Sequence, residues 1–461
     1  MVFSSVVFLM FFLPCFLLIY YVLPFKTKNL FILLASYIFY AWGSSEFLYM
    51  LIVSTFMDYV FGLLIDRSKK VKHKKIFVSL SIIINLSLLA YFKYANFFVD
   101  QFNDVLVVLG MTGFHWINVA LPVGISFFTF HKISYIVDVY RGKEKAMRSY
   151  IDFSLYIALF PQLIAGPIIR FNEIASQFKE RKHSIDKFFD GMWRFSIGLG
   201  KKVILANAAG RIADEVFQLS NQDLSMPIAW IGIICYSLQI YFDFSGYSDM
   251  AIGLGKMMGF DIPENFNMPY ISKSITEFWR RWHISLSRFF RDYVYIPLGG
   301  NREGAFKTNR NLWIVFFLTG FWHGASWNFI IWGLFHGLFL VIEKNTTFLS
   351  KSHSTLRVLT TYFIVLVGWV FFRVETLSNA LLYLTRMFDF TNITNPFQYI
   401  ISLSPKNIIF TILALILSFV TIKGEWLKKD IIRGVILLVI WFYCILLLSN
   451  SNYNPFIYFR F

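Results

Sequence analysis

Apolar runs of about 20 residues recur from one end of the chain to the other, and each could cross a hydrocarbon core about 30 Å thick. The composition agrees, because 57% of the 461 residues are hydrophobic and only 15% are charged. The runs are continuous and lack the short alternating segments of a membrane β-barrel. The sequence therefore predicts an all-α polytopic membrane protein with about ten to twelve spanning helices.

The net charge of +16 is concentrated in short loops between these runs. The densest basic loop covers residues 66–75, and Lys26 and Lys28 lie in the loop after the first run. Short basic loops stay cytoplasmic, so this pattern predicts an extracytoplasmic N-terminus. Residues 3–23 have no basic leader or cleavage site and are interpreted as a retained spanning helix. The lipid bilayer is the expected partner of these charges, and no nucleic acid is expected.

Two segments depart from regular spans. Residues 160–167 contain two prolines and a glycine, which favours a broken or re-entrant helix lining a cavity. The run 228–242 ends at Asp243 and Asp249, which predicts a polar network at the end of a span. The three cysteines are scattered without metal-ligand spacing, so no metal site is expected. No segment is long enough for a separate soluble core, and residues 1–461 are interpreted as a single domain.

The stretch from Glu277 to Gly337 contains most of the candidate functional residues. At 100° per residue, its first part predicts a helix lying in the membrane interface, with an aromatic face and a rim of arginines. These are Arg280, Arg281, Arg288 and Arg291. Membrane anchoring and phosphate binding explain the arginines equally well. Glu277 precedes Arg281 by four residues, which predicts a helical ion pair.

Two histidines, His283 and His323, are the candidate catalytic groups of this stretch. A histidine in an apolar run is a functional candidate because its burial is costly. Gly320, His323, Gly324 and Trp327 have the spacing of one helical face. The glycines would make room for a ligand chain or for a neighbouring backbone. A helix-packing role for His323 remains the alternative.

A third histidine, His336, follows thirteen residues after His323 and shares a helical face with Glu343. On a straight helix it would be rotated by about 220° from His323 and would face away from it. We interpret His336 as a structural histidine that is either packed or paired with Glu343.

The nucleophile motif G-x-S-x-G and the zinc-binding motif H-E-x-x-H are both missing from the sequence. A neutral imidazole can nevertheless act as a general base on a hydroxyl group. Attack on a thioester needs no metal or covalent enzyme intermediate when donor and acceptor are held together. From the residues alone, acyl transfer, a proton relay and a histidine-lined transporter all remain open.

Three motifs resemble the membrane-bound O-acyltransferase family: residues 282–287, 291–300 and 322–324. Within it, they resemble the bacterial branch of alginate O-acetylases and membrane subunits of peptidoglycan O-acetyltransferases. Segments 121–142, 160–170, 241–253, 368–373 and 454–461 also resemble that branch, except that Arg460 stands where its pattern has Gln.

The resemblance implies spanning and slanted helices around a central tunnel or funnel. It implies that His323 corresponds to the invariant histidine of the family and His283 to its second polar position. The four arginines would bind the phosphate of a cytoplasmic donor, either acetyl-CoA or an acyl-carrier thioester. These donors are substrates, and no tightly bound cofactor is expected.

The resemblance further implies delivery of an acetyl group across the bacterial cytoplasmic membrane to an extracytoplasmic glycan. A separate extracytoplasmic esterase-like acetyltransferase commonly completes the transfer, and a polysaccharide synthase complex is a further expected partner. D-alanyl transfer to teichoic acid is the nearest alternative, although residues 296–302 favour the acetylating branch. The second alternative is a transporter of the acyl donor that catalyses no reaction.

Overall fold

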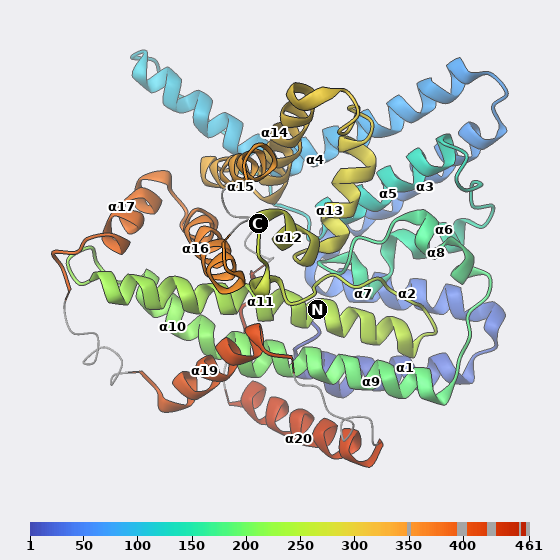
Figure 1. The fold of residues 1–461 in the computed structure, drawn as a ribbon. Coiled ribbons are helices and arrows are strands. Elements are labelled where there is room, and N and C mark those ends of the chain that lie inside the picture. The colour runs from blue at the N-terminus through green and yellow to red at the C-terminus, as the bar shows by residue number, and fades with distance from the viewer. Residues whose placement is uncertain (348–351, 394–402, 422–429, 451–452, 458–461) are drawn as a thin grey trace. The chain divides into compact units, whose positions relative to one another are not determined.

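The computed structural model describes residues 1–347, 352–393, 403–421, 430–450 and 453–457. In these ranges the chain forms helices joined by loops, without β-strands (Figure 1). This confirms the predicted all-α class. Arg460 and residues 423–429 of a predicted basic loop lie outside the described residues.

Among the described residues, five helical segments are long and apolar enough to cross a membrane. They are residues 25–67, 71–108, 226–257, 354–373 and 430–449. Each lies on an apolar run found in the sequence. The number of ten to twelve spans and the central tunnel remain predictions.

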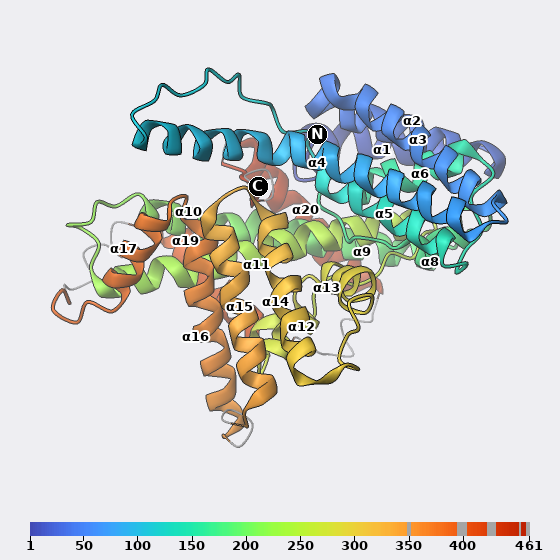
Figure 2. The same cartoon turned by 90° about the horizontal axis from the view of Figure 1, so that it is seen from above.

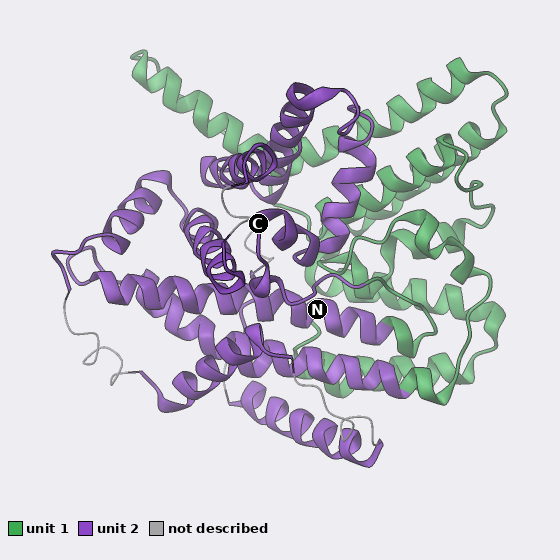
Figure 3. Cartoon of the chain, in the orientation of Figure 1, with its two compact units in different colours: residues 1–188, 255–263 green, residues 189–254, 264–461 purple. Residues whose placement is uncertain are grey.

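The chain divides into two compact units, which are coloured separately in Figure 3. Unit 1 comprises residues 1–188 and 255–263, and unit 2 comprises residues 189–254 and 264–461. Both units are assembled from two stretches of sequence. The interpretation of the whole chain as one domain remains a prediction.

The helices of unit 1 follow the apolar runs of the N-terminal part. They are α1 (Leu13–Val22), α2 (Phe25–Ser44), α3 (Leu48–Arg67), α4 (Val71–Val108), α5 (Ile125–Tyr140), α6 (Tyr150–Ala158), α7 (Phe160–Leu163) and α8 (Phe171–Ile174). Pro24 separates α1 from α2, since its ψ of 152° is extended and it has no N–H to continue a helix.

The helix break predicted at residues 160–167 is confirmed, whereas a re-entrant course and the lining of a cavity remain predictions. Helix α6 ends at Ala158, α7 has only four residues, and residues 159–169 are all buried. Gly124 packs against this break with a φ of 76°, and a Cβ there would lie 2.5 Å from the carbonyl oxygen of Leu163. Protein therefore shelters the irregular backbone, as a membrane environment requires.

Unit 2 holds the helices of the central and C-terminal parts. Most of α9 (Ile185–Gly200) and α11 (Met226–Met257) lies in it, with α10 (Asn207–Phe217), α12 (Ile275–Arg281), α13 (Ile284–Phe290), α14 (Gly304–His323), α15 (Trp327–Asn345), α16 (Ser354–Arg373), α17 (Leu377–Met387), α19 (Pro405–Phe419) and α20 (Asp430–Ser449). Helices α14, α15 and α16 run side by side in both Figure 1 and Figure 2.

The expectation that a span ends at residue 242 is wrong. Helix α11 continues past Asp243 and Asp249 to Met257. Both carboxylates are buried partway along the helix, where cations neutralise them. Asp243 pairs with Lys202 at 2.7 Å, and Asp249 pairs with Lys201 at 2.6 Å and with Arg194 at 2.7 Å. The predicted polar network therefore exists, but it lies within the helix.

Helices α14 and α15 approach each other through a glycine pair. A Cβ on Gly320 would lie 2.2 Å from the carbonyl oxygen of Phe329, and one on Gly333 would lie 2.3 Å from that of Phe316. A Cβ on Gly324 would lie 2.2 Å from the ring of Phe329. The sequence predicts that the glycines beside His323 make room for either a ligand chain or a neighbouring backbone. The structure shows close packing instead of room for a ligand: Gly320 meets the backbone of α15, and Gly324 meets the ring of Phe329.

We expect Gly320→Ala to destabilise the protein by about 1–3 kcal/mol, because the added methyl group overpacks the contact between α14 and α15. The measurement is the thermal unfolding midpoint of the detergent-purified protein. The matched control is Gly434→Ala in α20, where a Cβ meets nothing within 4 Å and alanine improves helix propensity. Equal midpoints for Gly320→Ala and wild type would contradict the tight contact.

Candidate active site

His323 is the last residue of α14, at the turn of the hairpin between α14 and α15. It is 4% exposed and is surrounded by aromatic rings. Its ring centroid lies 4.8 Å from Trp322, 5.0 Å from Trp332 and 5.1 Å from Phe372. The aromatic residues come from α14, α15 and α16, so the fold brings three helices to this imidazole.

The predicted continuous helix through Gly320, His323, Gly324 and Trp327 is wrong. Gly324 is extended, with φ of −168° and ψ of 157°, and α15 begins at Trp327. Because α15 folds back along α14, the rotation expected for His336 on a straight helix does not apply. Trp332 instead contacts both histidines, with its ring 5.0 Å from His323 and 5.2 Å from His336.

His336 is packed among aromatic rings, which is the first of the two structural roles predicted for it. It is fully buried, stacks on Phe278 with centroids 6.2 Å apart, and meets the edges of Trp279 and Trp332. The pairing with Glu343 is wrong, because that carboxylate accepts hydrogen bonds from Ile275 N and Thr276 N instead. Glu343 thereby caps the N-terminus of α12.

His283 interrupts the helix that the sequence predicts through Arg280, Arg281, Arg288 and Arg291. Helix α12 ends at Arg281 and α13 begins at Ile284, with His283 between them at φ 44° and ψ 54°. This left-handed conformation is uncommon for a residue with a Cβ, and such strain is a marker of functional sites. His283 is completely buried.

Asn265 holds His283 in place, and sequence reasoning missed this residue. Its Oδ1 lies 3.2 Å from His283 Nδ1 and accepts hydrogen bonds from Ser285 N at 3.1 Å and Ser285 Oγ at 2.8 Å. Its backbone oxygen accepts from Ile284 N at 2.9 Å, and its Nδ2 donates to Ser248 Oγ at 3.2 Å. Asn265 therefore caps α13 and orients the imidazole together.

These bonds assign the tautomer of His283. An amide oxygen only accepts, so Nδ1 of His283 carries the hydrogen that points to Asn265 Oδ1. His283 lies outside the five candidate spans, and burial lowers its pKa to about 3. The neutral ring therefore carries its basic lone pair on Nε2.

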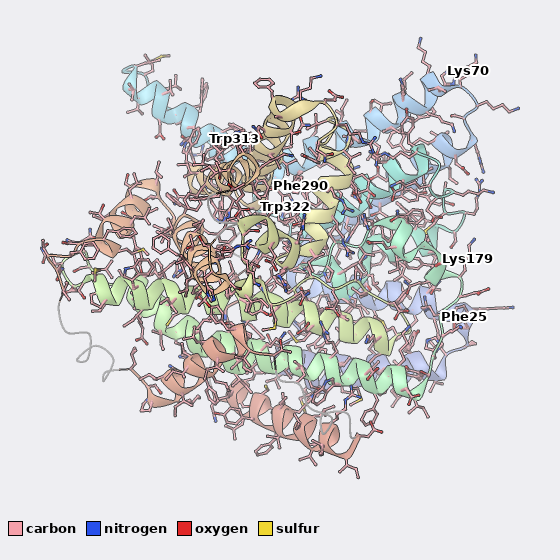
Figure 4. All side chains as sticks on the ribbon, viewed as in Figure 1. Phe25, Lys70, Lys179, Phe290, Trp313 and Trp322 are labelled. Atoms are coloured by element: carbon pink, nitrogen blue, oxygen red, sulfur yellow. The ribbon has the colours of Figure 1, made fainter. Side chains whose placement is uncertain are left out.

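Trp322 connects the two candidate histidines. Its ring centroid lies 6.1 Å from that of His283 and 4.8 Å from that of His323. The two imidazoles are therefore separated by no more than the sum of these distances. Figure 4 labels Trp322 on the ribbon of α14. The structure thus brings together two histidines that lie forty residues apart in the sequence.

The four arginines of the stretch differ in their surroundings. Arg281 forms the predicted ion pair with Glu277 at 2.8 Å, and Arg291 pairs with Asp292 at 2.7 Å. Arg280, Arg288 and Arg291 are exposed. The charges of Arg281 and Arg291 are thus partly neutralised within the chain.

A cavity of about 460 Å³ lies beside α12, α15 and α16. Its wall is partly apolar and includes the cation Lys273 and the carboxylate Glu343. Arg357 also lines it and donates to the backbone oxygen of Lys273 at 3.2 Å. His323 does not line this cavity.

Comparison with known proteins identifies the fold and its chemistry. Residues 2–373 match the model of the membrane-bound O-acyltransferase family. The chain belongs to this family. It is therefore a multi-pass membrane protein and an O-acyltransferase, and its candidate histidines both lie within the matched residues.

Three relatives of this O-acyltransferase cover most or all of its length. The chain is 49% identical to a protein of Azotobacter vinelandii named "Probable alginate O-acetylase", over 85% of this chain and 78% of the relative. It is 42% identical to a protein of Pseudomonas putida with the same name, over the full length of both. It is 39% identical to a "Peptidoglycan O-acetyltransferase" of Helicobacter pylori, over 83% of this chain and 78% of the relative.

Relatives from the D-alanylating alternative match less of the chain. The "Teichoic acid D-alanyltransferase" of Streptococcus thermophilus is 34% identical over 48% of this chain and 56% of the relative. The O-acetylating relatives are thus both closer in sequence and more complete in coverage.

We expect Asn265→Ala in this O-acyltransferase to lower acyl transfer about 10–100-fold, because His283 loses the acceptor that fixes its tautomer and α13 loses its cap. The measurement is O-acetyl released from isolated surface polysaccharide. Asn265→Asp keeps the oxygen acceptor and should retain more activity than Asn265→Ala. Equal activities for the two variants would exclude orientation of His283 by this oxygen.

Proposed function

We propose that this O-acyltransferase transfers an acetyl group from a cytoplasmic thioester donor, across the membrane, for O-acetylation of an extracytoplasmic polysaccharide. An alginate-like exopolysaccharide, peptidoglycan and another cell-surface glycan are the acceptors considered. The sequence relation to O-acetylases over most of the chain is the observation that carries this proposal. Acetyl-CoA or an acyl-carrier thioester serves as donor substrate, with no tightly bound cofactor.

In the proposed mechanism, His323 removes a proton from the acceptor hydroxyl as the thioester carbonyl is attacked. The thiol of the donor leaves, so one ester bond forms as one thioester bond breaks. His283 positions or polarises the reacting group through Nε2, the nitrogen that its bond to Asn265 leaves basic. The packing of Trp322 against both rings supports a shared site.

The donor side of the proposal rests on the arginines of α12 and α13. Arg280 and Arg288 are exposed to solvent, and Arg281 and Arg291 would have to exchange Glu277 and Asp292 for a phosphate. Arginine suits phosphate because its planar fork donates two parallel hydrogen bonds. All four remain candidates for donor binding.

We place the protein in the bacterial cytoplasmic membrane with its N-terminus outside. The contact between Lys28 and Tyr20 and the bond between Tyr20 and His183 support this topology, since they bring together two loops that both carry cytoplasmic charge patterns. A separate extracytoplasmic esterase-like acetyltransferase is the proposed partner for the final transfer. Association with a polysaccharide synthase complex is a further proposal.

The test is to incubate purified protein in vesicles with radiolabelled acetyl-CoA and a soluble hydroxyl acceptor. Label in the acceptor supports transfer. Label that crosses the membrane only as intact donor would support a transporter without chemistry. A D-alanyl thioester used in place of acetyl-CoA distinguishes the D-alanylating alternative.

A further inference from the structure

Lys28 and Arg181 are two buried cations of unit 1. Lys28 lies in the first turns of α2 and Arg181 in the loop before α9, and their exposed fractions are 7% and 8%. Neither forms an ion pair within unit 1, all of whose residues the structure describes. Asp152 offsets the charge of Arg181 only from a distance, without an ion pair. Burial of two like charges that lack a paired counter-ion is costly, so this region is suited to bind an anion.

The guanidinium group of Arg181 is held by aromatic rings. Its central carbon lies 4.3 Å from the ring centroid of Phe260 and 5.4 Å from that of Phe25. None of its three buried nitrogens makes a hydrogen bond of good geometry in unit 1, although the Tyr20 hydroxyl lies close enough to interact with the guanidinium group. Packing therefore holds the guanidinium group, and its five N–H donors are not saturated.

The polar groups around these cations are already occupied. The Tyr20 hydroxyl donates to Met258 O at 2.7 Å, so it accepts from His183 Nε2 at 2.8 Å. Lys28 donates to the backbone oxygen of Tyr20. The nearby carboxylate of Asp152 accepts from Asn29 Nδ2 at 2.6 Å. These contacts fix the groups without neutralising their charge.

An open pocket of about 420 Å³ is lined by Tyr21, His183, Ser184, Ile185 and Phe188. Lys28 and Arg181 lie behind this wall and do not line the pocket: Lys28 lies over the ring of Tyr21, and His183 bonds to Tyr20. Burial, then the charges of Lys28 and Arg181, lower the pKa of His183, as expected where the potential is positive. Tyr21, Phe25 and Ile185 are exposed apolar residues at this edge. Figure 4 labels Phe25 and, nearby, Lys179.

We propose that Lys28 and Arg181 form a binding site for a phosphate-bearing anion. The exposed apolar side chains around the cations favour the headgroup of an anionic phospholipid, whose phosphate would meet Arg181 while its acyl chains contact Tyr21 and Ile185. A diffusible phosphate compound presents the same group and is the second source to be tested. The residues of this site belong to unit 1 and the candidate histidines to unit 2, and the proposal does not rest on the proposed function.

The experiment compares the two phosphate sources on the purified, full-length protein. In the first arm, the protein is solubilised from vesicles with equal amounts of phosphatidylglycerol and phosphatidylcholine, and retained lipids are counted by native mass spectrometry. In the second arm, pyrophosphate is titrated into protein in phosphatidylcholine nanodiscs while the unfolding midpoint is measured. The variants are Arg181→Gln, Arg181→Lys and Lys28→Met, with Lys26→Met as the exposed control two residues from Lys28.

We expect wild type and Lys26→Met to bind one of the two probes, with phosphatidylglycerol preferred, and Arg181→Gln and Lys28→Met to bind it about tenfold more weakly. Arg181→Lys keeps the positive charge but loses the planar guanidinium group, so its affinity should lie between those of wild type and Arg181→Gln. This graded loss would also distinguish weaker binding from misfolding. The proposal fails if wild type binds neither probe. It also fails if Arg181→Gln and Lys28→Met bind as wild type does.

Discussion

Replacing His323 with alanine is expected to reduce O-acetylation by about 10²–10⁴-fold, the range for loss of a positioned general base. The ring is buried between Trp322, Trp332 and Phe372 at the end of α14, and none of these three aromatic side chains can accept the proton in its place. The measurement is acetate released from isolated surface polysaccharide, normalised to the amount of membrane-inserted protein.

The control for His323→Ala is His115→Ala, since His115 is exposed and belongs to unit 1. This variant should acetylate as wild type does. His323→Gln tests packing against chemistry, because glutamine retains polar contacts but cannot accept the proton. Wild-type acetylation by inserted His323→Ala would remove His323 from catalysis, and full activity of His323→Gln would restrict it to packing.

The sequence predicts the helices of this protein well and their interruptions poorly. Apolar run length predicts spans at residues 408–422 and 431–448, where α19 covers Pro405–Phe419 and α20 covers Asp430–Ser449. For α16 the predicted span of residues 360–372 begins six residues too late. The break at residues 160–167 is also predictable, because proline acts locally. Apolar run length and proline both act on the helix in which they occur, so the sequence around them is enough to predict their effect.

The break at His283 could not be predicted because residues distant in the sequence fix the helices on either side of it. Asn265 caps the start of α13 through bonds to Ile284 N and Ser285 N, and Glu343 caps the start of α12. Assigning residues to helical faces at 100° per residue assumes a continuous helix and takes no account of these two capping interactions. It therefore places the histidines in the right stretch of sequence but on the wrong faces.

The buried charges of α11 are a second case of long-range compensation. Apolar run length ends the span before Asp243, since a lone carboxylate in lipid is expensive. Lys202 cancels that charge from another part of unit 2, so the helix continues. A hydropathy pattern contains Asp243 but carries no information about its distant ion-pair partner Lys202.

Lys202→Met is accordingly expected to destabilise the protein by about 3–5 kcal/mol, the cost of leaving a buried partner unpaired. The side chains of Lys202 and Asp243 are 3% and 2% exposed, and their charged atoms lie 2.7 Å apart. Lys202 also donates to Pro455 O, and Ile457 N donates to Asp243 Oδ2 at 2.8 Å. The substitution should therefore also release residues 453–457, and the measurements are the unfolding midpoint and protease cleavage near the C-terminus.

The double variant Lys202→Met with Asp243→Asn separates charge from packing. It removes both charges, and the oxygen of asparagine can still accept from Ile457 N, so it should recover much of the stability lost in Lys202→Met. The surface control is Lys307→Met, whose pair with Glu303 is 48% and 47% exposed and is worth about 0–1 kcal/mol. If the double variant is as unstable as Lys202→Met, the loss comes from the contacts of Lys202 with Pro455 and Asn207 and not from an uncompensated carboxylate.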